Sequence, residues 1–267
     1  MRIALAQLDV EAAAVEANCE RAEVAIAEAA DRGADLVALP EIFNVGYFAF
    51  DAYRREAEPV EGPTLTRMAD AAREHGVGLL AGTIVEDLAE TESVPTPTEE
   101  GLANTAVLFD RAGERLAVYR KHHLFGYDSA EAEMLVPGER LGVAEFEGAT
   151  VGMTTCYDLR FPELYREIAE AGADLILVPS AWPYPRVEHW KLLARARAVE
   201  NQLFVAAING SGEFDGSTLL GRSTVYDPWG TTLASTGDDP DLVMADADLD
   251  RVDAAREEFP AWRDRRI

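Results

Sequence analysis

The stretch GADLVALPE at residues 33–41 returns in closely similar form as GADLILVPS at residues 172–180. Each copy begins with a glycine that ends a helical pattern, continues as a short apolar run typical of a buried strand, and ends in proline followed by a polar residue. The repeat predicts an α/β fold with two βαβ-like halves. Because sites in such folds collect at the carboxyl ends of strands, we expect Glu41 and Ser180 to lie close together.

Helical and apolar patterns alternate along the rest of the chain. Helices are expected over residues 12–32, 63–75 and 187–200, from about residue 162, and in a short last segment. Strands are expected at residues 2–8, 34–40, 77–85, 104–121 as a pair, 143–155 as a hairpin, 173–179, 203–208, 222–234 as a pair, and 242–249. The acidic, proline-bearing segment 86–101 is expected to be a surface loop, so residues 1–267 are expected to form a single domain.

The chain is strongly acidic, with 49 Asp and Glu residues against 24 Lys and Arg residues and a net charge of −25. Nucleic acids and anionic membranes bind positive fields, so this composition argues against both as partners. No apolar run is long enough to cross a bilayer, and the beginning of the sequence lacks a signal-peptide pattern. A cytoplasmic location is therefore expected.

Lysine is nearly absent from the basic residues. Of the 24, 22 are arginine, and only Lys121 and Lys191 are lysine. Acid excess with little lysine is typical of proteins from salt-accumulating halophiles, where salt screens the self-repulsion. A GC-rich genome with a generally acidic surface is the alternative explanation. In both cases a retained lysine indicates a position where arginine cannot replace it.

The segment GMTTCYDLRFPEL, residues 152–164, places Cys156 where a predicted strand gives way to a helix. Such a turn exposes the cysteine side chain and directs backbone N–H groups toward the substrate group that the thiol attacks. A free thiol with a pKa of about 8.5 is mostly protonated at neutral pH, so it needs a neighbouring base. From these residues alone, a buried structural role stays open. Cys19 lies in an alanine-rich helical pattern and is expected to have no chemistry.

Two other polar residues follow predicted strands. Glu41 directly follows an apolar run. Burying a carboxylate there costs free energy unless it pairs with another group or has a catalytic role; the alternative is that Glu41 is a helix cap or a surface acid. Lys121 lies beside aromatic residues in VYRKHHLFGY, whereas Lys191 lies in a helical pattern and is expected to be a packing or surface residue. The adjacent His122 and His123 would point to opposite faces of a strand, and no HExxH or CxxC pattern occurs, so no metal site is expected.

Together these segments resemble the carbon–nitrogen hydrolase (nitrilase) superfamily. LPEIF, YRKHHLF, GMTTCYDLRFPEL, HWKLLARARAVENQLFVAAING and GRSTVYDPWG occur in family order over essentially the whole chain. The resemblance implies a four-layer αββα sandwich that usually dimerises, and no metal or organic cofactor. It also implies a Glu–Lys–Cys triad at Glu41, Lys121 and Cys156. A further family glutamate that holds the lysine maps to Glu131 by its distance before the Pro-Gly pair, and Glu133 stays open.

These roles require perturbed pKa values. Glu41 must take a proton from Cys156, yet the ordinary pKa values of about 4.3 and 8.5 leave a gap of roughly 6 kcal/mol. We expect burial to raise the pKa of Glu41 and the Lys121 cation to lower the pKa of Cys156. Lys121 and the backbone N–H of Tyr157 would stabilise the oxyanion. An acyl-thioester would form, ammonia would leave, and water would attack with Glu41 again as base.

The residues after Cys156 indicate the branch of the superfamily. True nitrilases typically have Cys-Trp-Glu, whereas CYDLRFPE resembles the Nit-type amidases, including ω-amidases that act on dicarboxylic acid monoamides. Amide hydrolysis is therefore favoured, with N-carbamoyl amino-acid hydrolysis and then nitrile hydrolysis as alternatives. A catalytically silent binding or regulatory member is the alternative of a different class, and the presence of all three triad groups argues against it.

The expected substrate is a small amide or ureido compound, and the expected macromolecular partners are further copies of the chain, in a homodimer or a higher homo-oligomer. The substrate-binding candidates are Tyr47, His123, Tyr157, Ser180, Trp182 and Arg186. Arg186, in SAWPYPRVEHW, has the bidentate donors to clamp a substrate carboxylate, but a surface arginine fits the same pattern.

Overall fold

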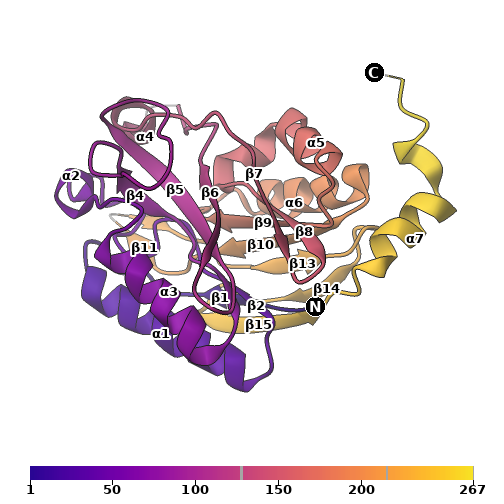
Figure 1. The fold of residues 1–267 in the computed structure, drawn as a ribbon, viewed down its shortest axis with the longest axis horizontal. Helices are drawn as coiled ribbons and strands as arrows, with labels where there is room; N and C mark the ends of the chain where they lie inside the picture. The colour runs from indigo at the N-terminus through magenta and orange to yellow at the C-terminus, as the bar shows by residue number, and fades with distance from the viewer. Residues whose placement is uncertain (127–128, 215, 267) are drawn as a thin grey trace.

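The computed structural model describes residues 1–126, 129–214 and 216–266, in which two β-sheets lie face to face (Figure 1). The first sheet has the order β15 (Asp241–Asp246), β1 (Arg2–Gln7), β2 (Leu36–Ala38), β3 (Gly78–Leu80), β5 (Leu102–Phe109), β4 (Ile84–Asp87), and β6 (Arg115–Arg120) pairs with β5. The second sheet has the order β14 (Thr232–Ser235), β13 (Thr224–Tyr226), β10 (Phe204–Asn209), β9 (Leu175–Ser180), β8 (Ala149–Met153), β7 (Gly142–Phe146). A separate short pair is formed by β11 (Glu213–Phe214) and β12 (Ser217–Thr218).

Helices cover the outer faces of both sheets. The first sheet carries α1 (Val15–Asp31) and α3 (Pro63–His75), and the second carries α5 (Pro162–Glu170) and α6 (Val187–Asn201) (Figure 1). The shorter elements are α2 (Tyr53–Glu56), α4 (Ala130–Met134), the 3₁₀ turn η1 (Cys156–Arg160), α7 (Asp250–Glu258) and the 3₁₀ turn η2 (Pro260–Trp262). This is the expected αββα sandwich. Across the described ranges, no helix is both long and apolar enough to span a membrane.

Burial on both faces explains why the strands are apolar throughout. In β1, Ile3 belongs to the same buried cluster as Leu175 of β9, so it faces the second sheet. The next residue, Ala4, belongs to the cluster that contains Ile26 of α1. Because successive side chains on a strand point to opposite faces, each central strand contributes to both cores.

The two copies of the repeated stretch occupy equivalent places. β2 lies parallel to β1 and β3, and β9 lies parallel to β8 and β10. Each strand follows a helix that ends at a left-handed glycine, Gly33 with φ 80° or Gly172 with φ 97°. The N–H of Glu41 donates to the carbonyl of Ser180 at 3.4 Å, so the two strand ends meet as the repeat predicts.

Several element boundaries differ from those predicted, and two of them have a clear physical reason. The expected strand over residues 77–85 is wrong, because it divides into β3 and β4 at Gly82, where φ is +50° and a Cβ would lie 2.1 Å from the carbonyl oxygen of Pro40. This close approach to the end of β2 depends on a segment distant in sequence. Similarly, α1 begins at Val15 rather than residue 12, because Ala13 has φ 55° and donates its N–H to the carbonyl of Val45.

Candidate active site

Strained turns carry two of the predicted triad residues. Cys156 itself has φ 45°, and Ile42, directly after Glu41, has φ 44°. A residue with a side chain in this left-handed region carries backbone strain, which is concentrated at functional sites and turns in proteins. The turn at Ile42 is held by its N–H, which donates to the hydroxyl of Thr83 at 2.7 Å. Both turns sit at the ends of strands, where the two sheets meet.

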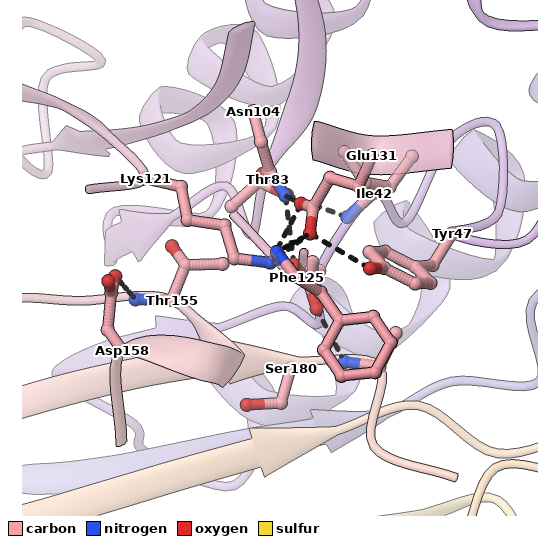
Figure 2. A network of polar contacts seen from close by, with 12 residues as sticks. Ile42, Tyr47, Thr83, Asn104, Lys121, Phe125, Glu131, Thr155, Asp158 and Ser180 are labelled. Atoms are coloured by element: carbon pink, nitrogen blue, oxygen red, sulfur yellow. Dashed lines mark hydrogen bonds and ion pairs between the residues drawn. The ribbon is translucent and has the colours of Figure 1, made fainter. Parts of the chain in front are cut away.

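The ammonium of Lys121 lies between two carboxylates in a fully buried cluster (Figure 2). Its Nζ is 2.8 Å from Oε1 of Glu41, and 2.8 and 3.0 Å from Oε1 and Oε2 of Glu131. All three side chains are 0% exposed. Glu133 is exposed, so of the two candidates it is Glu131 that contacts the lysine.

Donors from four further segments hold the two carboxylates in place. Asn104 Nδ2 donates to Oε1 of Glu41 at 2.8 Å and to Oε1 of Glu131 at 3.2 Å. The N–H of Ala181 donates to Oε2 of Glu41 at 2.8 Å. Oε2 of Glu131 accepts from the hydroxyl of Tyr47 at 2.9 Å and from the N–H of Phe125 at 2.8 Å. Carboxylates that accept several such bonds keep one orientation. The cluster is therefore a rigid, preorganised arrangement.

Burial perturbs the pKa values of the cluster. Desolvation raises the pKa of Glu41, an effect that Lys121 opposes and Glu131 reinforces. Burial lowers the pKa of Lys121, but the charges of Glu131 and Glu41 outweigh it, and the pKa is raised. Burial, and then the charge of Glu41, raise the pKa of Cys156 well above its usual value.

The raised pKa of Cys156 corrects the expectation that Lys121 would lower it. The lysine does act in the predicted direction, but its charge is already shared by Glu41 and Glu131. Desolvation of the thiolate therefore prevails. A thiol in this position is protonated near neutral pH and needs a base in order to react.

A cavity of about 400 Å³ opens beside Cys156. Of the predicted substrate-binding residues, Tyr47, Tyr157, Trp182 and Arg186 line it, and so does Arg160. The guanidinium of Arg160 lies 5.0 Å from the ring centroid of Trp182. No Asp or Glu lines this cavity in the parts of the chain that the structure describes.

His123 and Ser180 lie outside the wall of this cavity. β6 ends at Arg120, so His122 and His123 follow the strand rather than lying on its two faces. The ring of His123 instead lies with Nδ1 2.8 Å from Oδ1 of Asp158. Ser180 is fully buried, and its hydroxyl donates to a carbonyl of its own strand.

Asp158 holds together the turn that carries Cys156. Its buried carboxylate accepts from the hydroxyl of Tyr119 (2.6 Å), the N–H of Thr155 (2.9 Å) and the N–H of His123 (2.9 Å), in addition to the His123 ring contact. Tyr119 and His123 flank Lys121 in sequence. Asp158 therefore fixes the distance between the end of β6 and the turn at Cys156.

Sequence reasoning missed Asn104 and Phe125. Asn104 carries a weak signal, because it is a polar residue inside the apolar run of NTAVLF. Phe125 contributes a backbone N–H, for which its side chain gives no signal. Within the described residues, no group of three or more His, Cys, Asp or Glu side chains is arranged to hold a metal ion.

The carbon–nitrogen hydrolase family model matches residues 2–257. The chain belongs to the carbon–nitrogen hydrolase family. It is 37% identical over 237 residues to the 2-oxoglutaramate amidase of Paenarthrobacter nicotinovorans, with 87% of this chain and 79% of that protein covered. It is 35% identical over 275 residues to the human omega-amidase NIT2, with 99% and 95% covered.

Solved structures of this superfamily share the fold. Saccharomyces cerevisiae Nit3, a member of branch 10 of the nitrilase superfamily, matches with a TM-score of 0.89 at 31% identity, covering 100% of this chain and 97% of that chain. An amidase from Nesterenkonia sp. AN1, in a structure showing Michael addition of acrylamide at the active site cysteine, matches with a TM-score of 0.82 at 31% identity over 97% and 98%. This carbon–nitrogen hydrolase is an amidase with the cysteine chemistry of its family.

Proposed function

We propose that this carbon–nitrogen hydrolase cleaves the amide of a small dicarboxylic acid monoamide and releases ammonia. The observation that carries the proposal is the charge of the cavity. In a chain with a net charge of −25, the described cavity wall holds Arg160 and Arg186 and no carboxylate, while the charge of Lys121, which also borders the cavity, is compensated by two buried glutamates. A site of this sign selects an anionic substrate. The names of the 2-oxoglutaramate amidase and omega-amidase relatives agree with this substrate class.

In the proposed reaction, Cys156 is the nucleophile and Glu41 its base. Glu41 takes the thiol proton as the sulfur attacks the amide carbonyl, and Lys121 with the backbone N–H of Tyr157 stabilises the oxyanion. The tetrahedral adduct then breaks its C–N bond, and Glu41 returns the proton to the leaving nitrogen. Water, deprotonated by Glu41, attacks the thioester carbonyl, the C–S bond breaks to release the acid product, and Glu41 returns the proton to the Cys156 thiolate. Glu131 keeps Lys121 in position throughout.

The free carboxylate of the substrate is assigned to the mouth of the cavity. Arg160 comes from η1 and Arg186 from the segment before α6, and both side chains are partly exposed. The guanidinium of Arg186 lies 5.7 Å from the ring centroid of Phe125, which borders the cavity. Guanidinium groups bind carboxylates in a bidentate manner, so the two arginines suit the acid end while the amide reaches the buried thiol.

A matched pair of amides tests the substrate class. Loss of two charge-assisted hydrogen bonds, each worth about 1.5–3 kcal/mol, predicts at least a ~100-fold higher kcat/KM for a dicarboxylic acid monoamide than for an uncharged amide of equal length. Arg186→Gln should remove much of this preference, mainly by raising KM. Arg73→Gln, which removes the same charge from an exposed position on α3, should keep it. Equal kcat/KM for the two amides in the wild-type enzyme would contradict the proposal.

The nucleophile is tested separately with the two cysteines, because both are buried and free. Cys156→Ala should abolish turnover, whereas Cys19→Ala, within α1, should leave it near the wild-type value. A slowly hydrolysed ester analogue should leave an acyl mass on the peptide that contains Cys156. An adduct on Cys19 would refute the assignment.

We also propose that residues 1–267 act as one hydrolase domain within a homodimer. Large apolar side chains are exposed on one face of α6 and beside it: Leu192 (65%), Val199 (48%), Trp229 (43%) and Phe259 (58%). Leu192 and Val199 lie two helical turns apart on α6. The ring centroids of Trp229 and Phe259 lie 6.3 Å apart. Such clusters mark interfaces. The mass in solution should be that of a dimer, and Val199→Asp should give a monomer.

We place the enzyme in the cytoplasm of a salt-accumulating organism. The support is the net charge of −25 together with 22 arginines against two lysines. Salt screens the repulsion between surface carboxylates, so the melting temperature should rise steeply with KCl. A melting temperature that stays constant from about 0.1 M to about 3 M KCl would contradict this interpretation.

A further inference from the structure

The buried cluster contains a group that the mechanism above does not use, the side-chain amide of Asn104. This residue of β5 is 1% exposed, and its Nδ2 donates to Oε1 of both Glu41 and Glu131, at 2.8 and 3.2 Å (Figure 2). Its Oδ1 has no hydrogen-bond partner among the described residues. An unpartnered buried carbonyl is unfavourable, so the benefit of an asparagine here must come from its N–H groups.

The orientation of this amide follows from its neighbours. A flipped amide would place its oxygen against two carboxylate oxygens, which repel it and cannot donate a hydrogen bond when ionised. With the nitrogen facing them, one hydrogen is available for each carboxylate. The position of Asn104 is set by the sheet, because its backbone carbonyl accepts the N–H of Lys121 at 2.9 Å. Asn104 therefore supplies neutral donors where two carboxylates converge on one ammonium.

The cluster needs such donors because its charges do not balance. With both glutamates ionised and Lys121 protonated, one excess negative charge remains in a buried site. The titratable groups that face Glu41 are Lys121 after β6, Glu131 of α4, Cys156 of η1, Tyr47 before α2 and Tyr53 of α2. Of these, only Lys121 stabilises the Glu41 charge by its own charge, and it is shared with Glu131.

We propose that Asn104 is a positioning residue that keeps Glu41 ionised in the resting enzyme and directs its Oε2 toward Cys156. The proposal rests on the role of Glu41 proposed above. Oε1 of Glu41 is occupied by Asn104 and Lys121, while Oε2 accepts from the N–H of Ala181, a residue that lines the same cavity as Cys156. Without the amide, Glu41 loses a donor to its ionised form and takes up a proton at higher pH, so it cannot accept one from the thiol.

The variant Asn104→Leu tests this role, because it keeps a similar volume and removes both N–H groups. Loss of a hydrogen bond to the ionised carboxylate raises the pKa of Glu41. The acidic limb of the pH profile of kcat/KM should therefore move to higher pH. A charge-assisted hydrogen bond corresponds to a shift of about one pH unit or more. The same shift should appear in the rate of Cys156 alkylation by iodoacetamide, measured in a Cys19→Ala background.

A matched control is available in Asn201. It is fully buried on α6, its Nδ2 donates to the backbone carbonyl of Arg197 at 3.0 Å, and its Oδ1 also lacks a partner among the described residues. Asn201→Leu removes a comparable buried amide far from any carboxylate of the cluster. It should lower the melting temperature and leave the acidic limb where it is in the wild-type enzyme.

The outcomes separate this proposal from the function on which it rests. An acidic limb that is unchanged in folded Asn104→Leu overturns the role of Asn104. If Asn104→Leu does not fold, the isosteric variant Asn104→Asp takes its place and adds a third carboxylate to the cluster. The acidic limb of the pH profile should again move to higher pH, and an unchanged limb overturns the proposal. If Glu41→Gln alkylates with the wild-type pH dependence, Glu41 is not the base, and the proposed mechanism itself fails.

Discussion

Arg120 and Lys121 are adjacent in sequence, and both are buried cations held by carboxylates, yet they form different kinds of site. The guanidinium of Arg120 binds both oxygens of Glu86 at 2.7 Å, and its remaining nitrogen donates to the carbonyl of Pro95 at 3.0 Å. The ammonium of Lys121 is shared between two glutamates and borders the cavity beside Cys156.

The difference teaches that the shape of the cation decides the role of the pair. A planar guanidinium binds both oxygens of a single carboxylate, which makes a brace between β6 and β4. A compact ammonium binds two carboxylates and still borders the cavity beside Cys156. In a chain with 22 arginines, this explains why a lysine is retained at position 121.

The largest expected effect comes from Lys121→Arg, after which positions 120 and 121 would both carry a guanidinium. Charge is kept, but the longer planar group would crowd the carbonyl of the substrate or hold Glu41 in a bidentate pair and lower its basicity. Loss of an oxyanion contact typically costs about 100- to 1,000-fold in kcat, and we expect at least that loss with an unchanged circular dichroism spectrum. Retention of more than about a tenth of the wild-type kcat would remove Lys121 from the triad.

The control for this substitution is Lys191→Arg. Lys191 is exposed on α6, and it does not line the cavity. The guanidinium has room there, so kcat and KM should stay near their wild-type values. A comparable loss in both variants would mean that arginine substitution is harmful for a general reason.

A smaller effect, on stability rather than on turnover, is expected for Arg120→Met. It removes the partner of Glu86, which is 0% exposed, and breaking a buried ion pair in this way costs about 3–5 kcal/mol of unfolding free energy. Urea unfolding measures that loss, while kcat of the folded enzyme should change little because Arg120 is not among the cavity-lining groups beside Cys156. A large fall in kcat with unchanged stability would reverse the comparison.

The smallest effect is expected when both partners of the brace are replaced. Apolar residues of similar size often substitute for a buried ion pair at little cost, so Glu86→Leu combined with Arg120→Met should recover most of the lost stability. Recovery will be incomplete, because the hydroxyls of Thr91 and Thr105 lose the carboxylate that accepts from them. A double variant less stable than Arg120→Met alone would show that the brace is not an independent unit.

The sequence by itself determined the segments that meet at the site, and its resemblance to one family implied the layers of the sandwich. Periodicity revealed the helices and most strands, because burial selects apolar residues at regular intervals. The repeat around Glu41 and Ser180 indicated that two strand ends converge. Glu41, Lys121 and Cys156 were recognisable because each is a reactive polar residue where an apolar run ends, within segments that resemble one family.

Only the tertiary structure decided how these groups are connected. The break of a strand at Gly82 and the choice of Glu131 over Glu133 depend on contacts between distant segments. The raised pKa of Cys156 depends on burial and on how many carboxylates share one lysine, and neither quantity is encoded locally. The donors at Asn104 and Phe125 could not be predicted for the same reason: a hydrogen bond is defined by the distance between two groups, and the fold alone sets that distance.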